Sequence, residues 1–500
     1  MSDVSETVDV AIVGFGPVGA TLAHLLGMLG MRTLVLEREA DIYHLPRALH
    51  FDDEVMRIFQ WTGLAAQIST NTRVNPGMRF VDAEGRLLLD WPRSQAVGPQ
   101  GWHASYRFHQ PDLERALRGG LSGRRCVAVR SRCDVVRIED AGDHVLLHYE
   151  DMNDGHTRCV RAGYVVGCDG ARSIVRRFMD VGMEDYGFHE RWLVVDVILK
   201  GAKPTLGDHS VQHCNPSRSA TYVRGPGNRR RWEIAVRPGE DDRQMTTPSE
   251  VWTLLADWIT PEEADLERTA VYTFHSLIAE RWRQGRLLIA GDAAHQTPPF
   301  MGQGMCAGIR DAANLAWKLA LVRRWKASDA LLDTYQSERH PHVREYVTTA
   351  VRLGGLINTC GTEAALRAAI QVPDGTTRME SIAPPLGLGL GCGRHRGRLF
   401  GQPRLADGRL MDDVAPFAPV LVAEAALAAR LTVPPDLALV TTRETPEAAQ
   451  HLARLDATAA LLRPDRYVFG TAGTAAELKA LLAAMPGSHV TYPEPEAALP

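Results

Sequence analysis

Several features of common protein classes are missing from this chain of 500 residues. Its eight cysteines are scattered and form no Cys-x-x-Cys pair, so we expect reduced, mostly packing thiols and no disulfide framework. The eighteen histidines have no metal-ligand spacing, and no metal site is predicted. No apolar run approaches the roughly 18 residues that span a bilayer, and the start, Met-Ser-Asp-Val-Ser-Glu, has no signal-peptide pattern. A cytoplasmic protein without a membrane partner is expected.

An excess of charge of either sign is also missing. The chain has 56 basic and 60 acidic side chains, a formal net charge of −4. This balance predicts neither a nucleic-acid surface nor a basic face for anionic lipids. The length makes room for several domains and a large core.

A glycine-rich loop near the start is the first positive signal. The apolar run Val8 to Val13 is typical of a buried parallel strand, and it leads through Gly14-Phe-Gly16-Pro-Val-Gly19 into an Ala/Leu-rich helical stretch. Gly14 can make the turn, Gly16 lets the backbone approach a pyrophosphate, and Gly19 permits close packing of helix on sheet. The helix N-terminus adds N–H donors and a partial positive charge. The alternative is a glycine-rich turn that binds nothing.

A carboxylate stands where a dinucleotide site needs one. A second predicted strand begins at Thr33 and ends at Glu37, twenty-three residues after Gly14, and Arg38 follows it. From that place an acid can accept hydrogen bonds from the hydroxyls of an adenosine ribose. We therefore assign Glu37 and Arg38 to cofactor binding.

The segment from 286 to 323 indicates which dinucleotide is bound. Residues 286–292 are typical of a short strand that ends in Gly-Asp, and an amphipathic helix is predicted from Gly304. The loop between them can present Asp292 to a ribityl chain and set Pro298 and Pro299 against a flat ring. Its end, Gly302 to Met305, can aim amides at a flavin ring edge, where they would favour reduction. The alternative is a Gly/Pro junction without a ligand.

With these two segments in place, the chain resembles the single-component FAD-dependent aromatic hydroxylases, the group of p-hydroxybenzoate hydroxylase and phenol hydroxylase, over roughly residues 8 to 345. Three further stretches carry the resemblance: 168–176, with its Asp-Gly pair at Asp169; 108–117, whose Gln110 in the family contacts the flavin end of FAD; and 335–341. Within the group, 43–54, 192–196 and 231–240 look most like the 3-(3-hydroxyphenyl)propionate hydroxylases.

The resemblance implies an α/β fold. A Rossmann-like FAD-binding domain of the p-hydroxybenzoate hydroxylase type would occupy 1–184 and 281–372, with a β-sheet substrate domain inserted at 185–280. A linker at 373–404 would lead to a thioredoxin-like α/β domain at 405–500. That last unit has no cysteine and so cannot perform thiol redox chemistry.

The resemblance also implies a reaction. NADH or NADPH reduces FAD, O2 adds to the flavin as a C4a-hydroperoxide, and one oxygen is transferred to a phenolic ring ortho to its hydroxyl. A base near the phenol would help, and His50, three residues past Arg47 on the stretch leading from the FAD pyrophosphate to the ring, is our candidate. A histidine merely packed beside FAD is the alternative. Tyr222 or Arg224 would bind a substrate carboxylate, with a solvated strand arginine as the alternative, and Pro298 would border the substrate.

Two rival classes share the glycine loop and Gly291-Asp292. One is an FAD-dependent dehydrogenase or halogenase, although the chain has no Trp-x-Trp-x-Ile motif typical of halogenases. The other is a flavoprotein without enzymatic activity. Related hydroxylases acting on resorcinols or polyketide aromatics share most of the quoted residues, so the reaction is better indicated than the substrate. The residues do not distinguish NADH from NADPH, and a homodimer is one expectation for the assembly.

Overall fold

The computed structural model describes residues 4–359, 381–430, 434 and 437–487. Its first sheet contains five parallel strands in the order β18-β11-β1-β2-β8. The strand bounds are β1 Val4–Val13, β2 Thr33–Glu37, β8 Val127–Ser131, β11 His156–Gly167 and β18 Leu287–Ile289. β9 (Cys133–Asp140), β10 (Val145–Asp151) and β17 (Arg283–Gln284) extend this sheet in antiparallel fashion. Parallel strands joined through helices give the predicted Rossmann-like unit.

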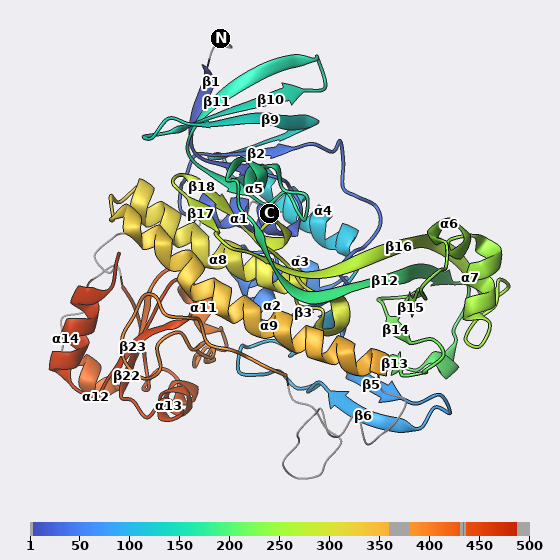
Figure 1. The fold of residues 1–500 in the computed structure, drawn as a ribbon. Helices are drawn as coiled ribbons and strands as arrows, with labels where there is room; N and C mark the ends of the chain where they lie inside the picture. The colour runs from blue at the N-terminus through green and yellow to red at the C-terminus, as the bar shows by residue number, and fades with distance from the viewer. Residues whose placement is uncertain (1–3, 360–380, 431–433, 435–436, 488–500) are drawn as a thin grey trace.

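Helices cover this sheet because their apolar residues face it. α1 (Pro17–Met28) packs against both α4 (Gln110–Gly120) and α8 (Gly304–Arg323). α8 is buried along nearly its whole length, from Cys306 to Val322. The short α5 (Ile174–Phe178) follows β11, and the long α9 (Asp333–Thr359) runs beside α8 across the molecule (Figure 1). Within the described residues, no helix combines the length and apolar character needed to cross a bilayer.

The second sheet reaches away from the first along two long strands, as Figure 1 shows in green. Its order is β19-β16-β12-β15-β14-β13-β5-β6. The bounds are β5 Gly77–Val81, β6 Leu87–Pro92, β12 Met183–Leu199, β13 Ser210–His213, β14 Ala220–Arg224, β15 Arg229–Ala235, β16 Ala264–Ala279 and β19 His295–Gln296. The predicted substrate domain spans 185–280, whereas this sheet also takes in β5, β6 and β19.

The two faces of the second sheet have different neighbours. On one face, Leu193, Val195 and Trp232 pack with residues of α6 (Asp242–Met245) and α7 (Pro248–Leu255). On the other, Trp192 packs with Phe300 of the predicted flavin loop and with α9. Alternation along each strand therefore decides which side chains can meet a bound flavin.

A third, small sheet is formed by strands that lie between β2 and β8 in the chain. β3 (His50–Asp52) and β4 (Arg73–Val74) both pair with β7 (Ser105–Arg107), with α2 (Asp53–Trp61) and α3 (Ala65–Ser69) following β3. Phe51 and Tyr106 point into the core and stack with ring centroids 5.1 Å apart. The opposite face is polar, because His50 pairs directly with Arg107 and Asp52 with Ser105.

The C-terminal unit is built on a four-stranded sheet in the order β21-β20-β22-β23. β20 is parallel to β21 and antiparallel to β22, which is antiparallel to β23. Its elements are α11 Met411–Val414, β20 Val420–Ala423, α12 Ala425–Ala428, β21 Ala438–Thr441, α13 Pro446–Ala453, β22 Ala459–Leu462, β23 Val468–Ala472 and α14 Ala475–Ala484. This mixed sheet with helices agrees with the predicted thioredoxin-like class. Part of the predicted linker and Cys360 lie outside the described residues.

Buried charges join the C-terminal unit to the rest of the chain. Arg463 donates to Glu338 of α9 at 2.8 Å, and both side chains are about 1% exposed. Arg57 of α2 bonds Asp412 at 2.6 Å, and Tyr467 donates its hydroxyl hydrogen to Glu54 of α2 at 2.7 Å. Separating a buried ion pair leaves an uncompensated charge. The contact of the C-terminal unit with α2 and α9 therefore favours one specific arrangement.

Candidate functional site

The glycine-rich turn between β1 and α1 has the geometry of a phosphate cradle. Gly14 has a φ of 99°, and a Cβ there would lie 2.5 Å from the carbonyl oxygen of Cys168. A Cβ on Gly19 would lie 2.1 Å from the carbonyl oxygen of Gly14, so the helix packs closely on the turn. Gly16, which caps α1, has no atom within 4 Å of the corresponding position. The open space therefore lies at Gly16, in front of the helix N-terminus.

Glu37 closes the turn at the end of β2. Its carboxylate accepts a hydrogen bond from the backbone N–H of Phe15 at 2.7 Å and one from that of Glu39 at 2.8 Å. These bonds hold the carboxylate beside the glycine-rich loop, where a ribose could reach its remaining lone pairs. Arg38 points to solvent and pairs with Glu39 at 3.1 Å, and its cofactor role stays a prediction.

Asp169 lies against the same turn. A Cβ on Gly14 would come within 2.9 Å of its Cα atom, and one carboxylate oxygen accepts from the N–H of Ile174 at 2.7 Å. The other oxygen is buried without a hydrogen-bond partner among the described residues. Burial raises the pKa of Asp169. A buried acceptor left unsatisfied is costly unless a ligand or water supplies a donor.

Asp292 is held at the end of β18 by a buried neighbour. Asp311 of α8 accepts from the N–H of Gly291 at 3.0 Å and contacts His295 at 2.6 Å and Arg339 at 2.8 Å. The side chain of Asp292 is solvent-accessible although burial among surrounding protein raises its pKa. A carboxylate that is accessible and yet surrounded by protein borders a cavity or cleft. Asp292 is therefore placed as expected for an acid that binds a ribityl chain.

The predicted flavin loop runs from Asp292 to the start of α8. Pro298 is buried, Pro299 opens a single 3-10 turn, and Gly302 ends it with a φ of 64°. A Cβ on Gly302 would lie 3.0 Å from the imidazole of His50, so the loop has no room for a side chain there. α8 begins at Gly304, and the free N–H groups of its first turn include that of Met305.

His50 has both ring nitrogens occupied by the protein. Nδ1 lies 3.1 Å from the carbonyl oxygen of Gly302, and Nε2 lies 2.8 Å from the hydroxyl of Ser105. Burial, together with the positive charge of Arg107, lowers the pKa of His50 to about 3. The neutral ring therefore donates to Gly302 and accepts from Ser105. This geometry favours the alternative of a packed, positioning histidine over a phenol base.

Gln110 and Arg47 shape the approach to His50. The Gln110 side-chain oxygen accepts from the backbone N–H groups of Arg47 and Ala48, at 2.9 and 2.8 Å, and its NH2 group donates to Glu114. The Arg47 guanidinium is exposed over the Tyr43 ring, and its charge opposes the raised pKa of Asp292. Gln110 thus holds the backbone of the loop, while Arg47 remains available to a ligand.

The structure turns Tyr222 and Arg224 away from the flavin loop, so this geometry does not support their predicted role in substrate binding. Tyr222 pairs with Trp232 and packs in the cluster that α7 covers. Arg224 has the same strand parity and lies 3.2 Å from Asp208. The residues of this sheet that face the loop are the intervening ones, such as Glu233. Alternation along the strand creates two faces, and the packing of α7 on one of them leaves the other toward the flavin loop.

Two groups of site residues were missed. Arg310 and Asp311 of α8 anchor the flavin loop: Arg310 bonds Asp52 at 2.6 Å and Gln303 at 3.0 Å, and Asp311 accepts from the N–H of Gly291. Both residues are charged and lie between one and two turns into a helix predicted to be buried on one face. Charged residues at such positions could have been predicted to bind the preceding loop. Arg93 and Arg107 lie close to His50, and no periodic pattern marks either.

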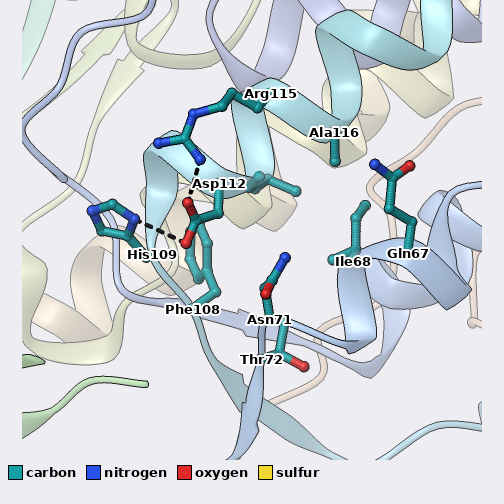
Figure 2. A pocket seen from close by; sticks show the side chains of 10 residues that line it. Gln67, Ile68, Asn71, Thr72, Phe108, His109, Asp112, Arg115 and Ala116 are labelled. Carbon is teal, nitrogen blue, oxygen red and sulfur yellow. Dashed lines mark hydrogen bonds and ion pairs between the residues drawn. The ribbon is translucent and has the colours of Figure 1, made fainter. Parts of the chain in front are cut away.

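A pocket of the molecular surface lies elsewhere. Figure 2 shows it between α3 and α4, where the side chains of His109 and Arg115 both turn to Asp112. His109 lies 3.0 Å from that carboxylate. None of the predicted site residues lines this pocket. Among the described residues, no group of three His, Cys, Asp or Glu side chains could hold a metal ion.

Known proteins are similar to this chain in sequence. The family model described as "FAD binding domain" matches residues 7–350. A "Probable NADH-specific resorcinol 4-hydroxylase" of Rhodococcus jostii (strain RHA1) is 37% identical, over 95% of this chain and 94% of that relative. A "3-(3-hydroxy-phenyl)propionate/3-hydroxycinnamic acid hydroxylase" of Mycobacterium sp. (strain JLS) is 38% identical over 76% of this chain, but only 64% of the relative is covered.

A solved structure supports the fold as a whole. The flavin-dependent monooxygenase PieE, in complex with FAD and substrate, superposes with a TM-score of 0.82 over 98% of this chain and 100% of that chain, at 21% sequence identity. The match extends through the C-terminal unit. The family model, the curated relatives and the glycine turn with Glu37 and Asp292 agree, and the chain belongs to the FAD-dependent aromatic hydroxylases.

Proposed function

We propose that this chain uses NADH or NADPH and O2 to hydroxylate a phenolic ring ortho to its hydroxyl, and that the substrate is a phenolic acid similar to 3-(3-hydroxyphenyl)propionate. The observation that carries the proposal is the open space in front of Gly16 at the N-terminus of α1, with the backbone of Asp169 packed against the same turn and the accessible carboxylate of Asp292 after β18. FAD fits these groups because it carries a pyrophosphate, a ribose and a ribityl chain.

Each group would have a separate task toward the cofactor. The N-terminus of α1 and Gly16 would bind the pyrophosphate, Glu37 the ribose, and Asp292 the ribityl chain. The first-turn amides of α8 would meet the flavin ring edge and favour its reduced state. FAD, when bound, supplies the electron transfer and oxygen chemistry, whereas the protein supplies orientation and exclusion of water.

The flavin loop would be kept in place by groups that do not touch the substrate. His50 donates to the carbonyl oxygen of Gly302, and Gln303 bridges Asp52 and Arg310. These bonds tie the loop to β3 and α8. Because oxygen transfer requires a fixed distance between flavin and ring, a rigid loop favours coupling of NAD(P)H oxidation to product formation.

Aerobic oxidation of NADH and of NADPH tests the proposal. Purified holoenzyme is assayed with and without a panel of meta- and para-substituted phenols, and product and H2O2 are measured separately. We expect one phenol class to stimulate oxidation and to give hydroxylated product in near stoichiometric amount. Turnover that yields only H2O2 with every phenol would refute the hydroxylase function.

A resorcinol is the second candidate substrate. It is favoured by the Rhodococcus relative, whose alignment covers 95% of this chain. That relative's name specifies NADH, so NADH is the first donor to test. A homodimer and a cytoplasmic location remain predictions, and light scattering of the purified holoenzyme measures the assembly directly.

A further inference from the structure

Two arginines lie beside His50 without a carboxylate of their own. Arg107 is directly opposite His50 in the small sheet, and Arg93 follows β6. Neither forms an ion pair with a carboxylate of the described residues. Arg107 donates to the Ser210 hydroxyl at 2.7 Å, and Arg93 donates only weakly, at 3.4 Å, to the backbone carbonyl of Pro92. Two guanidinium groups in one place are normally balanced by anions.

Their surroundings are those of an interior site. Burial lowers the pKa of each arginine to about 10, and the charge of Arg93 further lowers that of Arg107. The Nε atom of Arg107 is buried with no hydrogen-bond partner in the described chain. Both side chains nevertheless keep some accessible surface. Like Asp292, they therefore border space inside the protein rather than bulk solvent.

The carboxylates nearest to Arg93 and Arg107 pair with other arginines. Asp52 is bonded to Arg310 at 2.6 Å, and Glu233 lies 3.7 Å from Arg231. Burial raises the pKa of Glu233, which weakens its hold as a counter-ion. The two guanidinium groups thus leave positive charge beside the flavin loop.

An aromatic wall adjoins the charge. The Arg93 guanidinium stacks over the Trp91 ring at 4.3 Å from its centroid. Trp91 belongs to the apolar cluster that contains Trp192 and Phe300 of the flavin loop. A ligand with an aromatic ring and an anionic end matches this combination, since a planar guanidinium binds a carboxylate bidentately.

We propose that Arg93 and Arg107 form the binding site for the carboxylate of a phenolic acid substrate. The inference rests on the proposed hydroxylase function and narrows it, because a neutral resorcinol offers these arginines no charge. It also replaces Arg224, which lies on the other face of the second sheet. Arg107, next to His50, would contact the acid directly, with Arg93 as its partner.

The test compares an acid with its neutral analogue on oxidised holoenzyme. Dissociation constants of 3-(3-hydroxyphenyl)propionate and of 3-(3-hydroxyphenyl)propan-1-ol are measured from the change in flavin absorbance. Wild type should bind the acid more tightly than the alcohol. R107Q should weaken acid binding about 10- to 100-fold, the weight of one charge-assisted hydrogen bond, and leave alcohol binding nearly unchanged.

Controls distinguish loss of the arginine–carboxylate contact from unfolding of the variant. R191Q removes an arginine of β12 that pairs with Asp242 at 2.7 Å, and it should leave both constants unchanged. FAD content and melting temperature are measured for every variant. If R107Q does not fold, R107K and R93Q are used, and each should weaken the acid selectively.

The outcomes distinguish the two proposals. Equal binding of acid and alcohol by wild type, or an equal loss of both in R107Q, would overturn the carboxylate site, even if resorcinol is hydroxylated stoichiometrically. Selective loss of acid binding in R107Q without hydroxylation of any phenol would support the anion site and refute the hydroxylase function.

Discussion

Replacing Gly16 with Val should weaken FAD binding without destabilising the fold. Gly16 has φ −71° and ψ −174°, an extended conformation that any residue adopts, and a Cβ there has no atom within 4 Å. The apoprotein should therefore fold normally. The new side chain occupies the space that we assign to the pyrophosphate, which would lose about two charge-assisted hydrogen bonds of roughly 1.5 to 3 kcal/mol each. That corresponds to a loss of FAD affinity of about 10²- to 10⁴-fold.

The same change at Gly14 should act on the fold instead. Here φ is 99°, and the Cβ would lie 2.5 Å from the Cys168 carbonyl oxygen. Backbone strain of about 1 to 3 kcal/mol adds to overpacking of about 1 to 3 kcal/mol. Gly14→Val should therefore lower the free energy of unfolding of the apoprotein by about 2 to 6 kcal/mol.

Both variants and a control are purified without FAD and compared. Urea unfolding gives the stability of each apoprotein, and fluorescence titration gives the dissociation constant of FAD. Gly201→Val is the control, because Gly201 also has no atom within 4 Å and lies outside the site. Stoichiometric FAD in Gly16→Val, or an apoprotein of that variant as unstable as Gly14→Val, would refute this reasoning.

Three further changes test other parts of the structure. Asp292→Asn should weaken FAD binding about 10- to 100-fold, because a ribityl hydroxyl loses a charged acceptor; unchanged affinity measured by titration would exclude that contact. His50→Gln should leave the amount of product per NAD(P)H nearly unchanged. It should remove the part of the pH dependence of the free energy of unfolding that comes from His50. The native pKa of His50 is about 3 against an ordinary 6.5, so wild-type stability should fall between pH 6.5 and 3 by up to about 1.4 kcal/mol per pH unit. A tenfold fall in coupling would instead restore His50 as a base. Arg463→Met should cost about 3 to 5 kcal/mol in urea unfolding, because buried Asp465 loses its ion-pair partner while Glu338 keeps only Lys318; a loss below 1 kcal/mol would contradict the buried network.

Much of the cofactor site could be predicted because it depends on local rules. Positive φ at Gly14 and Gly302 and close packing at Gly19 are requirements that only glycine meets, so the sequence must record them. The carboxylates Glu37 and Asp292 stand directly at strand ends, which the apolar runs before them reveal. The strand-turn-helix order could therefore be predicted from the sequence.

The substrate side depends on long-range packing, which local sequence patterns do not record. Tyr222 and Arg224 lie on strand β14 within the predicted β-sheet domain, yet the face of that strand toward the flavin loop is decided by where α7 packs. Arg107 stands on a strand of three residues, too short for a recognisable period. The neutral state of His50 follows from its burial and from the charge of Arg107, and its ring is held by Gly302, 252 positions away.

The buried charges of the C-terminal unit have a consequence for synthesis in the cell. Glu54 on α2 and Glu338 on α9 have partners in Tyr467 and Arg463, which leave the ribosome long after the FAD-binding segments. N-terminal domains usually fold first during translation. In this chain the core around α8 and α9 can reach its final stability only when residues near 467 have emerged. At about 5 to 20 residues per second, the nascent chain spends several seconds beyond α9 in which Glu54 has Arg310 and Glu338 has Lys318 but both still lack their C-terminal partners, and it is then more exposed to proteases.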